Sequence, residues 1–440
     1  MLLIDLSPEI INLIVHFLGL SGKPLDLCGL ALSCRFLSVV VRPAIPSIVD
    51  LKLPSSRLSL LQRSIDEDPS YGHGVRSATL QRDNRRGSVD ETETREAIET
   101  FLLSTPAIRD LHLNEFYMPG VARFVLSTSL TLWTTLRKLK LADPQMNFTE
   151  LVDLLSRHQF RHLEAAHLNI MEVLEPPRET HPQSGLTYLD LRKSRIEDYV
   201  LGIILRRLPA VHTIRYRLPR SVERQATATA AQMNANHLIF PNRVELALLK
   251  ASKTLTRLDL SILYRRGRLV PDPARIDLSG MTALKELKIS ALYFFLVLNG
   301  GRGVLTDHPS RNGLYKLLPQ SLEALQMHFP NETEIFYPNP GQGSPERDRF
   351  VNGDMDASSY EWILELATFL PSLRYIFMNE THYNPGRPMN FDLEKWDAPG
   401  PIKILFEEAG IDVDIRVRVP RMIGVGSALR GISDLPDLFD

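Results

Sequence analysis

A short apolar pattern that returns along the chain constrains its fold more than any other feature. Each copy reads apolar, two variable residues, apolar, one variable residue, apolar. Alternating apolar residues indicate a half-buried strand, so each copy predicts one strand of a sheet. The copies begin at Ile48, Val75, Ile108, Leu136, Leu186, Val211, Leu255, Leu284, Leu322 and Leu373, and a weaker copy runs from Phe160 to Leu163.

Helical segments are expected between the copies. Apolar residues at three- and four-residue steps predict helices over Glu96–Leu103 and Thr149–Arg157. Capping-box spacing, Ser194 with Glu197 and Ser358 with Glu361, predicts two further helix starts. A strand and a helix per unit, with copies roughly 24 to 33 residues apart where the spacing is tight, resembles the leucine-rich repeat. The resemblance implies an α/β solenoid whose stacked units share one core.

The repeats depart from that family in one respect. Leucine-rich repeats carry Asn or Cys three residues after the last strand leucine, where the side chain bonds the backbone of the neighbouring turn. We expect no such polar ladder here, and therefore degenerate, irregular repeats. The corresponding positions hold Phe116, Pro144, Ser194, Leu263 and Leu292.

The boundaries of the solenoid follow from where the pattern begins and ends. We expect it to span residues 46–419, followed by a flexible tail over 420–440. Polar or Pro- and Gly-rich stretches predict inserted loops near 81–96, 219–236, 330–358 and 384–401. The stretch from Ile402 to Val419 predicts a helix, a break at Gly410, and an alternating strand that closes the open end of the sheet.

Residues 1–45 predict a separate three-helix module. Ser7 can cap a first helix, Pro8 suits its first position, and Glu9 faces the positive end of its dipole. Fewer than 45 residues bury too little surface to be stable alone, so the module needs a partner. That partner is either the rest of the chain or another protein.

This N-terminal stretch resembles the F-box in the order Leu6-x-Pro8-Glu9-Ile10, then Asp26-Leu27, then Cys34-Arg35-Phe36. The resemblance implies docking on the Skp adaptor of a cullin-RING ubiquitin ligase. The insert from Gly19 to Lys23 is long for the family. The resemblance implies adaptor-facing or supporting roles for Leu6, Pro8, Ile10, Ile14, Leu18, Leu27, Leu30 and Phe36. The alternative is an amphipathic helix that merely caps the following domain.

Composition argues against several partner classes. The chain has 51 basic and 52 acidic residues and a net charge of −1, which disfavours nucleic acid and anionic membranes. The longest apolar stretch, Ala291 to Leu298, has eight residues and is too short to span a bilayer. The two cysteines, Cys28 and Cys34, suit a reducing compartment, so we expect a cytoplasmic or nuclear protein.

The sequence predicts no enzyme and no cofactor. It contains no nucleophile elbow, no zinc-protease helix and no phosphate-cradling glycine loop. His158 and His162 are four residues apart, but the segment between them leads toward a strand, so a zinc pair there is disfavoured. Asp412 and Asp414 share one face of the last strand, where we expect a solvated edge.

A binding role remains. Variable residues of the strands point away from the core, toward the usual ligand surface of a solenoid. Basic residues in the middle copies suggest an acidic or phosphorylated target segment; an ordinary solvated face is the alternative. They are Lys138, Lys140, Arg192, Arg215, Arg217 and Arg257. The sequence thus predicts a substrate-recognition subunit of an SCF-type ubiquitin ligase, or alternatively a leucine-rich scaffold or inhibitor without that role.

Overall fold

The structure is a computed structural model of the 440-residue chain. It describes residues 6–7, 10–11, 13–14, 48–53, 56–82, 91–114, 135–142, 148–155, 161–166, 168–170, 184–192, 194–196, 198–216, 241–261, 275–294, 312–330, 361–381, 391–396, 398 and 400–420.

One long sheet runs through the described part of the chain. It has thirteen strands, and all neighbouring pairs are parallel except the last, β15 with β14. In spatial order they are β1 (Ile48–Leu53), β2 (Ser77–Arg82), β3 (Asp110–Asn114), β4 (Lys138–Ala142), β5 (His162–Ala166), β7 (Tyr188–Asp190), β9 (Thr213–Arg215), β10 (Arg257–Leu260), β11 (Glu286–Ser290), β12 (Ala324–Pro330), β13 (Tyr375–Thr381), β15 (Asp412–Pro420) and β14 (Phe391–Lys395). A second parallel pair joins β6 (Asn169–Ile170) and β8 (Arg195–Ile196).

Every copy of the apolar pattern forms one strand of this sheet, as the sequence predicts. In the later copies whose first apolar residue is described, that residue lies before the strand and is buried, as Val75, Ile108 and Leu136 show with no exposed surface. In the first copy Ile48 is half-buried and already lies inside β1, where Val49 and Leu51 are in register with Ala78 and Leu80. The two apolar residues inside the strand point to the same side and are buried too, for example Leu111 and Leu113. The pattern therefore defines both the strand and its core face.

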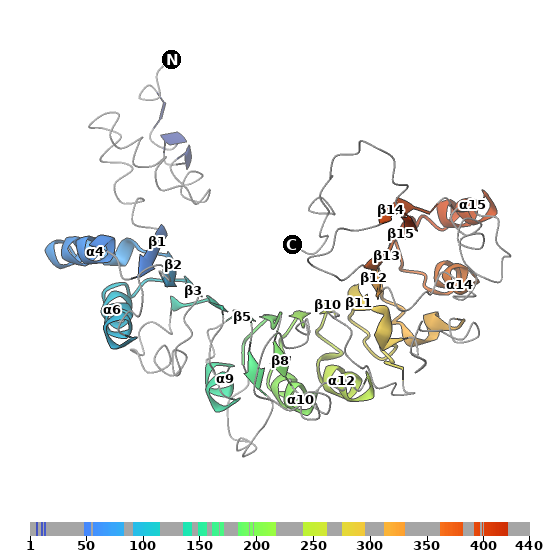
Figure 1. Ribbon diagram of the computed structural model, residues 1–440, viewed down its shortest axis with the longest axis horizontal. Helices are drawn as coiled ribbons and strands as arrows, with labels where there is room; N and C mark the ends of the chain where they lie inside the picture. The colour runs from blue at the N-terminus through green and yellow to red at the C-terminus, as the bar shows by residue number, and fades with distance from the viewer. Residues whose placement is uncertain are drawn as a thin grey trace.

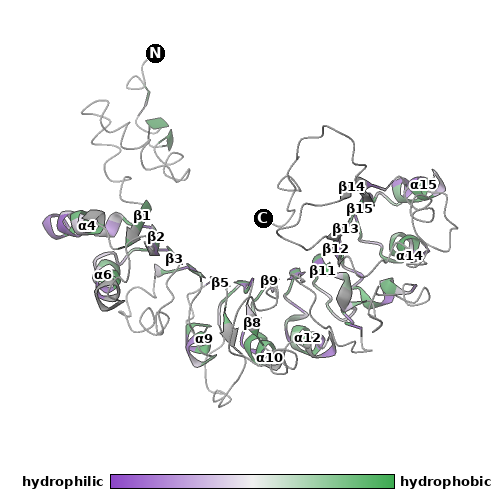
Figure 2. Cartoon of the chain, in the orientation of Figure 1, coloured by the Kyte–Doolittle hydropathy of each residue, from purple (hydrophilic) through white to green (hydrophobic). Residues whose placement is uncertain are grey.

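Helices cover the outer side of the sheet. In Figure 1 the strands line the inner side of an arc and the helices lie outside it. The helices are α4 (Ser56–Glu67), α5 (Ser70–Gly74), α6 (Glu91–Ser104), α9 (Phe148–Leu155), α10 (Asp198–Arg206), α12 (Pro241–Leu248), α14 (Glu361–Phe369) and α15 (Gly400–Glu408), with 3₁₀ turns η3 (Leu249–Ala251), η4 (Ala291–Tyr293) and η6 (Leu314–Leu317). These outer helices carry both hydrophobic and hydrophilic residues (Figure 2).

The arc has a geometric cause. Neighbouring strands lie about 4.8 Å apart, whereas packed helices need about 8–10 Å. A stack with strands on one side and helices on the other therefore bends, with the strands inside. One hydrophobic core fills the space between the two sides from Val49 in β1 to Ile415 in β15. The described chain is thus an α/β, solenoid-like stack whose inner face is the free face of the sheet.

Two predicted loops contain regular structure. α6 begins at Glu91, inside the loop expected near 81–96, because Ile98, Phe101 and Leu102 pack its later turns into the core. β14 and the start of α15 fall inside the loop expected near 384–401. β14 pairs with β15 through its backbone, so β14, and not the predicted last strand, ends the sheet.

The predicted arrangement at the C-terminal end is confirmed in its main parts. α15 is followed by Gly410 with φ +65°, and β15 comes next. The predicted loop at 330–358 and the predicted tail over 420–440 each begin with a residue that ends a strand, Pro330 in β12 and Pro420 in β15. The rest of both segments, and the predicted loop at 219–236, lie outside the described residues.

The predicted capping box at Ser194 is wrong. β8 follows Ser194, and α10 begins only at Asp198. The Ser194 hydroxyl instead donates to the carbonyl of Ala165 and accepts from the N–H of Leu168, both at 3.1 Å. A polar bridge to the neighbouring turn, which the sequence led us not to expect, therefore exists at this position. Ser358 lies outside the described residues.

Six residues of the predicted N-terminal module are described: 6–7, 10–11 and 13–14. The N–H of Ile11 donates to the carbonyl of Ser7 at 3.1 Å, which is a helical turn at the predicted place. The second and third predicted helices lie outside the described residues. No helix in the described ranges has both the length and the apolar character needed to cross a bilayer.

Candidate functional site

Strand register gathers the variable side chains of separate repeats on the inner face. The residue between the two buried apolar positions of each strand lies beside its counterpart in the next strand. We call this line of residues the central row. It consists of Asp50, Thr79, His112, Lys140, Glu164, Asp190, Arg215, Asp259, Lys288, Gln326, Phe377 and Asp414.

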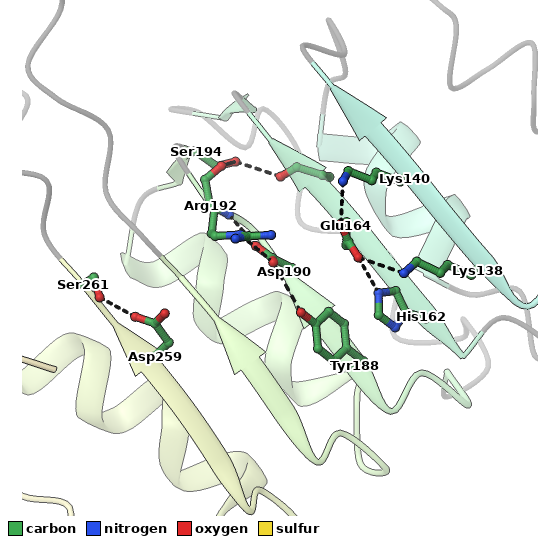
Figure 3. Close-up of polar contacts among 11 residues, drawn as sticks. Lys138, Lys140, His162, Glu164, Tyr188, Asp190, Arg192, Ser194, Asp259 and Ser261 are labelled. Atoms are coloured by element: carbon green, nitrogen blue, oxygen red, sulfur yellow. Dashed lines mark hydrogen bonds and ion pairs between the residues drawn. The ribbon is translucent and has the colours of Figure 1, made fainter. Parts of the chain in front are cut away.

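Glu164 on β5 is the centre of a charged cluster on this face (Figure 3). Its carboxylate lies 3.2 Å from Lys138 Nζ, 3.3 Å from Lys140 Nζ and 2.8 Å from His162 Nε2. The hydrogen bond to His162, with the two lysines, outweighs burial and holds the pKa of Glu164 well below its usual range. Glu164 is therefore a fixed anion that pairs with both lysines of β4 and accepts a hydrogen bond from the imidazole of His162.

An aromatic pair lies next to this cluster. The rings of His162 and Tyr188 stack with their centroids 3.8 Å apart, and the guanidinium of Arg215 lies 5.9 Å from the Tyr188 ring centroid. Burial, together with Asp190, raises the pKa of Tyr188 to about 12. Its phenol therefore stays protonated and donates to Asp190 Oδ2 at 3.4 Å.

Asp190 on β7 is buried and holds the turn that follows its strand. Arg192 Nε lies 2.7 Å from Asp190 Oδ2, and the N–H of Arg192 donates to Oδ1 at 3.0 Å (Figure 3). Burial raises the pKa of Asp190, and Arg192 counteracts this effect. Directly after β10, the hydroxyl of Ser261 similarly donates to Asp259 of that strand. Carboxylates of the central row therefore stabilise the ends of their own strands.

Two members of the central row have a buried polar atom without a hydrogen bond among the described residues. They are His112, through Nε2, and Gln326, through Oε1. Burial, reinforced by Lys140, lowers the pKa of His112 from 6.5 to about 4, so its imidazole is neutral at pH 7. Gln326 is only 5% exposed.

The basic residues predicted to bind a target are largely compensated by the protein itself. Lys138 and Lys140 share Glu164, and Arg192 pairs with Asp190. Arg257 Nη2 lies 2.6 Å from Glu286 Oε1 on the next strand. Arg215 is 8% exposed and lies in register between Asp190 and Asp259, while Arg217 lies outside the described residues.

These cations are therefore not the free basic surface that the sequence suggested. Their carboxylate partners come from the same or neighbouring strands, and an acidic target would have to compete with them. Target binding by these residues stays a prediction. Aligning the repeat copies with one another could have predicted these ion pairs, because residues at the same position of successive copies become neighbours in the sheet.

The described residues of the predicted adaptor surface differ in exposure. Ile10 and its neighbour Leu13 are 45% and 53% exposed, and Leu6 and Ile14 are half-buried. Ile11, which the sequence analysis did not single out, has no exposed surface. Pro8, Leu18, Leu27, Leu30 and Phe36 lie outside the described residues.

Within the described ranges, no group of three or more His, Cys, Asp or Glu side chains could hold a metal ion. Neither protein-family models nor curated proteins match this chain. The inner face is therefore the candidate site on its own geometry, as a broad polar surface suited to binding.

Proposed function

We propose that the protein is a substrate-recognition subunit of an SCF-type cullin-RING ubiquitin ligase. In this proposal residues 1–45 form an F-box that binds the Skp adaptor, and residues 46–419 form a degenerate leucine-rich-repeat solenoid that binds a protein target. The observation that carries it is a helical turn with exposed Ile10 and Leu13, placed in the chain before a curved stack with a polar inner face. Exposed apolar side chains on a helix favour a protein partner.

The proposed mechanism is proximity and requires no catalytic group in this chain. The adaptor and cullin hold the F-box, and the inner face holds the target. Tethering raises the effective concentration of target lysines near the ubiquitin carrier. Other subunits perform the transfer.

A second candidate is a leucine-rich scaffold or inhibitor without a ligase role. The polar inner face supports it, because that surface can bind a partner without an adaptor. Ile11 is fully buried but does not belong to the core cluster of the solenoid, so its burial does not favour a cap. The two candidates share the inner face as the binding surface. They differ in whether the chain binds the Skp adaptor.

Co-purification with the Skp adaptor tests the proposal. We expect the wild type to bind, and Ile10→Glu with Leu13→Glu to weaken binding at least about tenfold, because a docked apolar pair is replaced by charges. Leu246→Glu is the matched control, since Leu246 is a 62% exposed leucine on α12. We expect this control to bind the adaptor like the wild type.

Two outcomes would reject the ligase role. One is a wild-type chain that does not bind the adaptor, which would favour the scaffold. The other is a double variant that keeps wild-type circular dichroism and binds the adaptor with unchanged affinity.

A further inference from the structure

The first variable residue of the repeat pattern is arginine in four neighbouring units. Arg76, Arg109, Arg137 and Arg161 lie directly before β2, β3, β4 and β5. We call these residues the arginine row. This position lies just outside the strands, so it is not among the variable strand residues that the repeat pattern predicts for the inner face.

The backbone aligns the four arginines. The N–H of Arg109 donates to the carbonyl of Arg76 at 2.7 Å, and the N–H of Arg137 donates to that of Arg109 at 2.7 Å. The N–H of Arg161 continues the series to the carbonyl of Arg137 at 3.1 Å. Neighbouring strands are about 4.8 Å apart, so the row is about 14 Å long. It runs across the start of the strands at one end of the inner arc, where Figure 1 labels β2, β3 and β5.

The arginine row is exposed and uncompensated in the part of the chain that the structure describes. All four residues are exposed, and Arg76 Nη1 donates to the carbonyl of Ala107 at 3.3 Å. The guanidinium groups of Arg109, Arg137 and Arg161 have no ion pair among the described residues. This contrasts with the neighbouring lysines of β4, which are held by Glu164.

The same position changes character in the later units. It holds Thr187, His212 and Thr256, and then Lys285, whose Nζ lies 2.7 Å from Glu323 Oε1. Among the described strands, arginines at this position in consecutive units are therefore confined to β2, β3, β4 and β5, and Arg374 before β13 stands alone. Asp110, the first residue of β3, follows Arg109 directly and is an exposed negative charge beside the arginine row.

The chemistry of guanidinium groups selects the kind of ligand. Each one can donate two parallel hydrogen bonds to a carboxylate or a phosphate. A length of about 14 Å corresponds to about four or five residues of extended peptide at about 3.3 Å per residue. Nucleic acid is disfavoured, because the chain has a net charge of −1 and a pI near 6.9 and so lacks a broad basic field.

We propose that the arginine row binds an extended acidic or phosphorylated segment of a partner protein. This inference rests on the proposed role of the solenoid in holding a protein target. The proposed anion site is therefore not formed by Lys138, Lys140, Arg192 and Arg257, which pair with carboxylates of the protein, but lies at the N-terminal ends of strands β2 to β5. Glu164 pairs with both lysines of the adjacent inner face, whereas Arg109, Arg137 and Arg161 have no carboxylate partner among the described residues.

Fluorescence anisotropy on the full chain tests this site. The probes are fluorescein-labelled short peptides with phosphoserine at alternate positions, with glutamate at those positions, and with unmodified serine. We expect the phosphoserine peptide, or both anionic peptides, to bind and the serine peptide not to bind. Binding of the phosphoserine peptide alone means a phosphorylation-dependent site; equal binding of the glutamate peptide means an acidic-segment site.

Charge reversal locates the binding. We expect Arg109→Glu with Arg137→Glu to weaken binding of the anionic peptide by about tenfold or more, because charge-assisted contacts are replaced by repulsion. Arg374→Glu is the matched control: Arg374 is exposed at the same position before β13 and its N–H donates to the Glu323 carbonyl at 2.7 Å. We expect its effect to stay within about twofold. If the double glutamate variant fails to fold, Arg109→Gln with Arg137→Gln is tested in its place.

Several outcomes would overturn the inference. They are no binding of either anionic peptide by the wild type, equal weakening by Arg374→Glu, or tighter binding of a single-stranded DNA oligonucleotide than of any peptide. Adaptor co-purification of the same variants separates this inference from the proposed function. If the wild type binds the adaptor but no anionic peptide, only the arginine-row site is rejected. If it binds the peptide but not the adaptor, only the ligase role is rejected.

Discussion

Ser194 shows how one hydroxyl can join two units of the stack. It is fully buried and bonds both the Ala165 carbonyl and the Leu168 N–H. We expect Ser194→Ala to lower the free energy of unfolding by about 1–3 kcal/mol, because two buried backbone groups lose their partner. Urea denaturation measures the change.

Ser64→Ala is the control for this prediction. Ser64 is half-buried on α4, and its hydroxyl donates an exposed hydrogen bond to the Leu60 carbonyl at 3.1 Å. We expect its loss to change the free energy of unfolding by less than about 0.5 kcal/mol. Equal effects of the two substitutions would mean that the Ser194 bridge contributes nothing of its own.

At the residue scale, the sequence predicts which side chains face the inner side but not how they pair. Lys138 and Lys140 were correctly assigned to the variable positions of one copy. Glu164 pairs with both because strand register places β5 beside β4, and register is a tertiary property. Predicting these ion pairs therefore requires knowing which strands lie side by side.

Gly410 sets the junction between α15 and β15. Its φ of +65° lies in the left-handed region, and no atom lies within 4 Å of a Cβ built there. The effect of a side chain is therefore conformational and not a clash. We expect Gly410→Ala to lower the free energy of unfolding by about 1 kcal/mol, measured by urea denaturation.

Gly400→Ala is the matched control, because Gly400 begins α15 and a Cβ there also meets no atom within 4 Å, without the positive φ. We expect this substitution to be neutral or slightly stabilising. A loss at Gly400 as large as that at Gly410 would contradict a conformational role for Gly410.

At the element scale, strands were predicted better than the segments between them. Each strand carries its own apolar alternation, so its pattern is local. α6 starts in a polar stretch, and its position depends on Ile98, Phe101 and Leu102 packing several residues later. β14 forms because its backbone pairs with β15, and no side-chain pattern in the sequence predicts that pairing. Elements that depend on distant partners were therefore assigned as loops.

At the scale of the whole molecule, the stack joins each unit chiefly to its two neighbours. β10 pairs with β9 and β11, and not with the strands at either end of the sheet. Stability in such a stack is a sum of unit and neighbour contributions. A defect in one unit should therefore stay local.

Leu258→Ala in β10 tests this locality, since Leu258 is buried in the middle of the sheet. We expect a local loss of about 2–5 kcal/mol, because removal of a buried leucine side chain leaves a cavity. Hydrogen exchange followed by mass spectrometry should show faster exchange in β9, β10 and β11, with β1, β2 and β3 unchanged.

Leu246→Ala is the control for locality, because Leu246 lies on α12 with its side chain mostly exposed. We expect exchange in this variant to match the wild type throughout the sheet. Faster exchange of all strands in Leu258→Ala would show one cooperative unit, and neighbour coupling would then extend along the whole arc. Exchange that changes only around β10 would mean that the two ends of the molecule can bind different partners without sharing a folding transition.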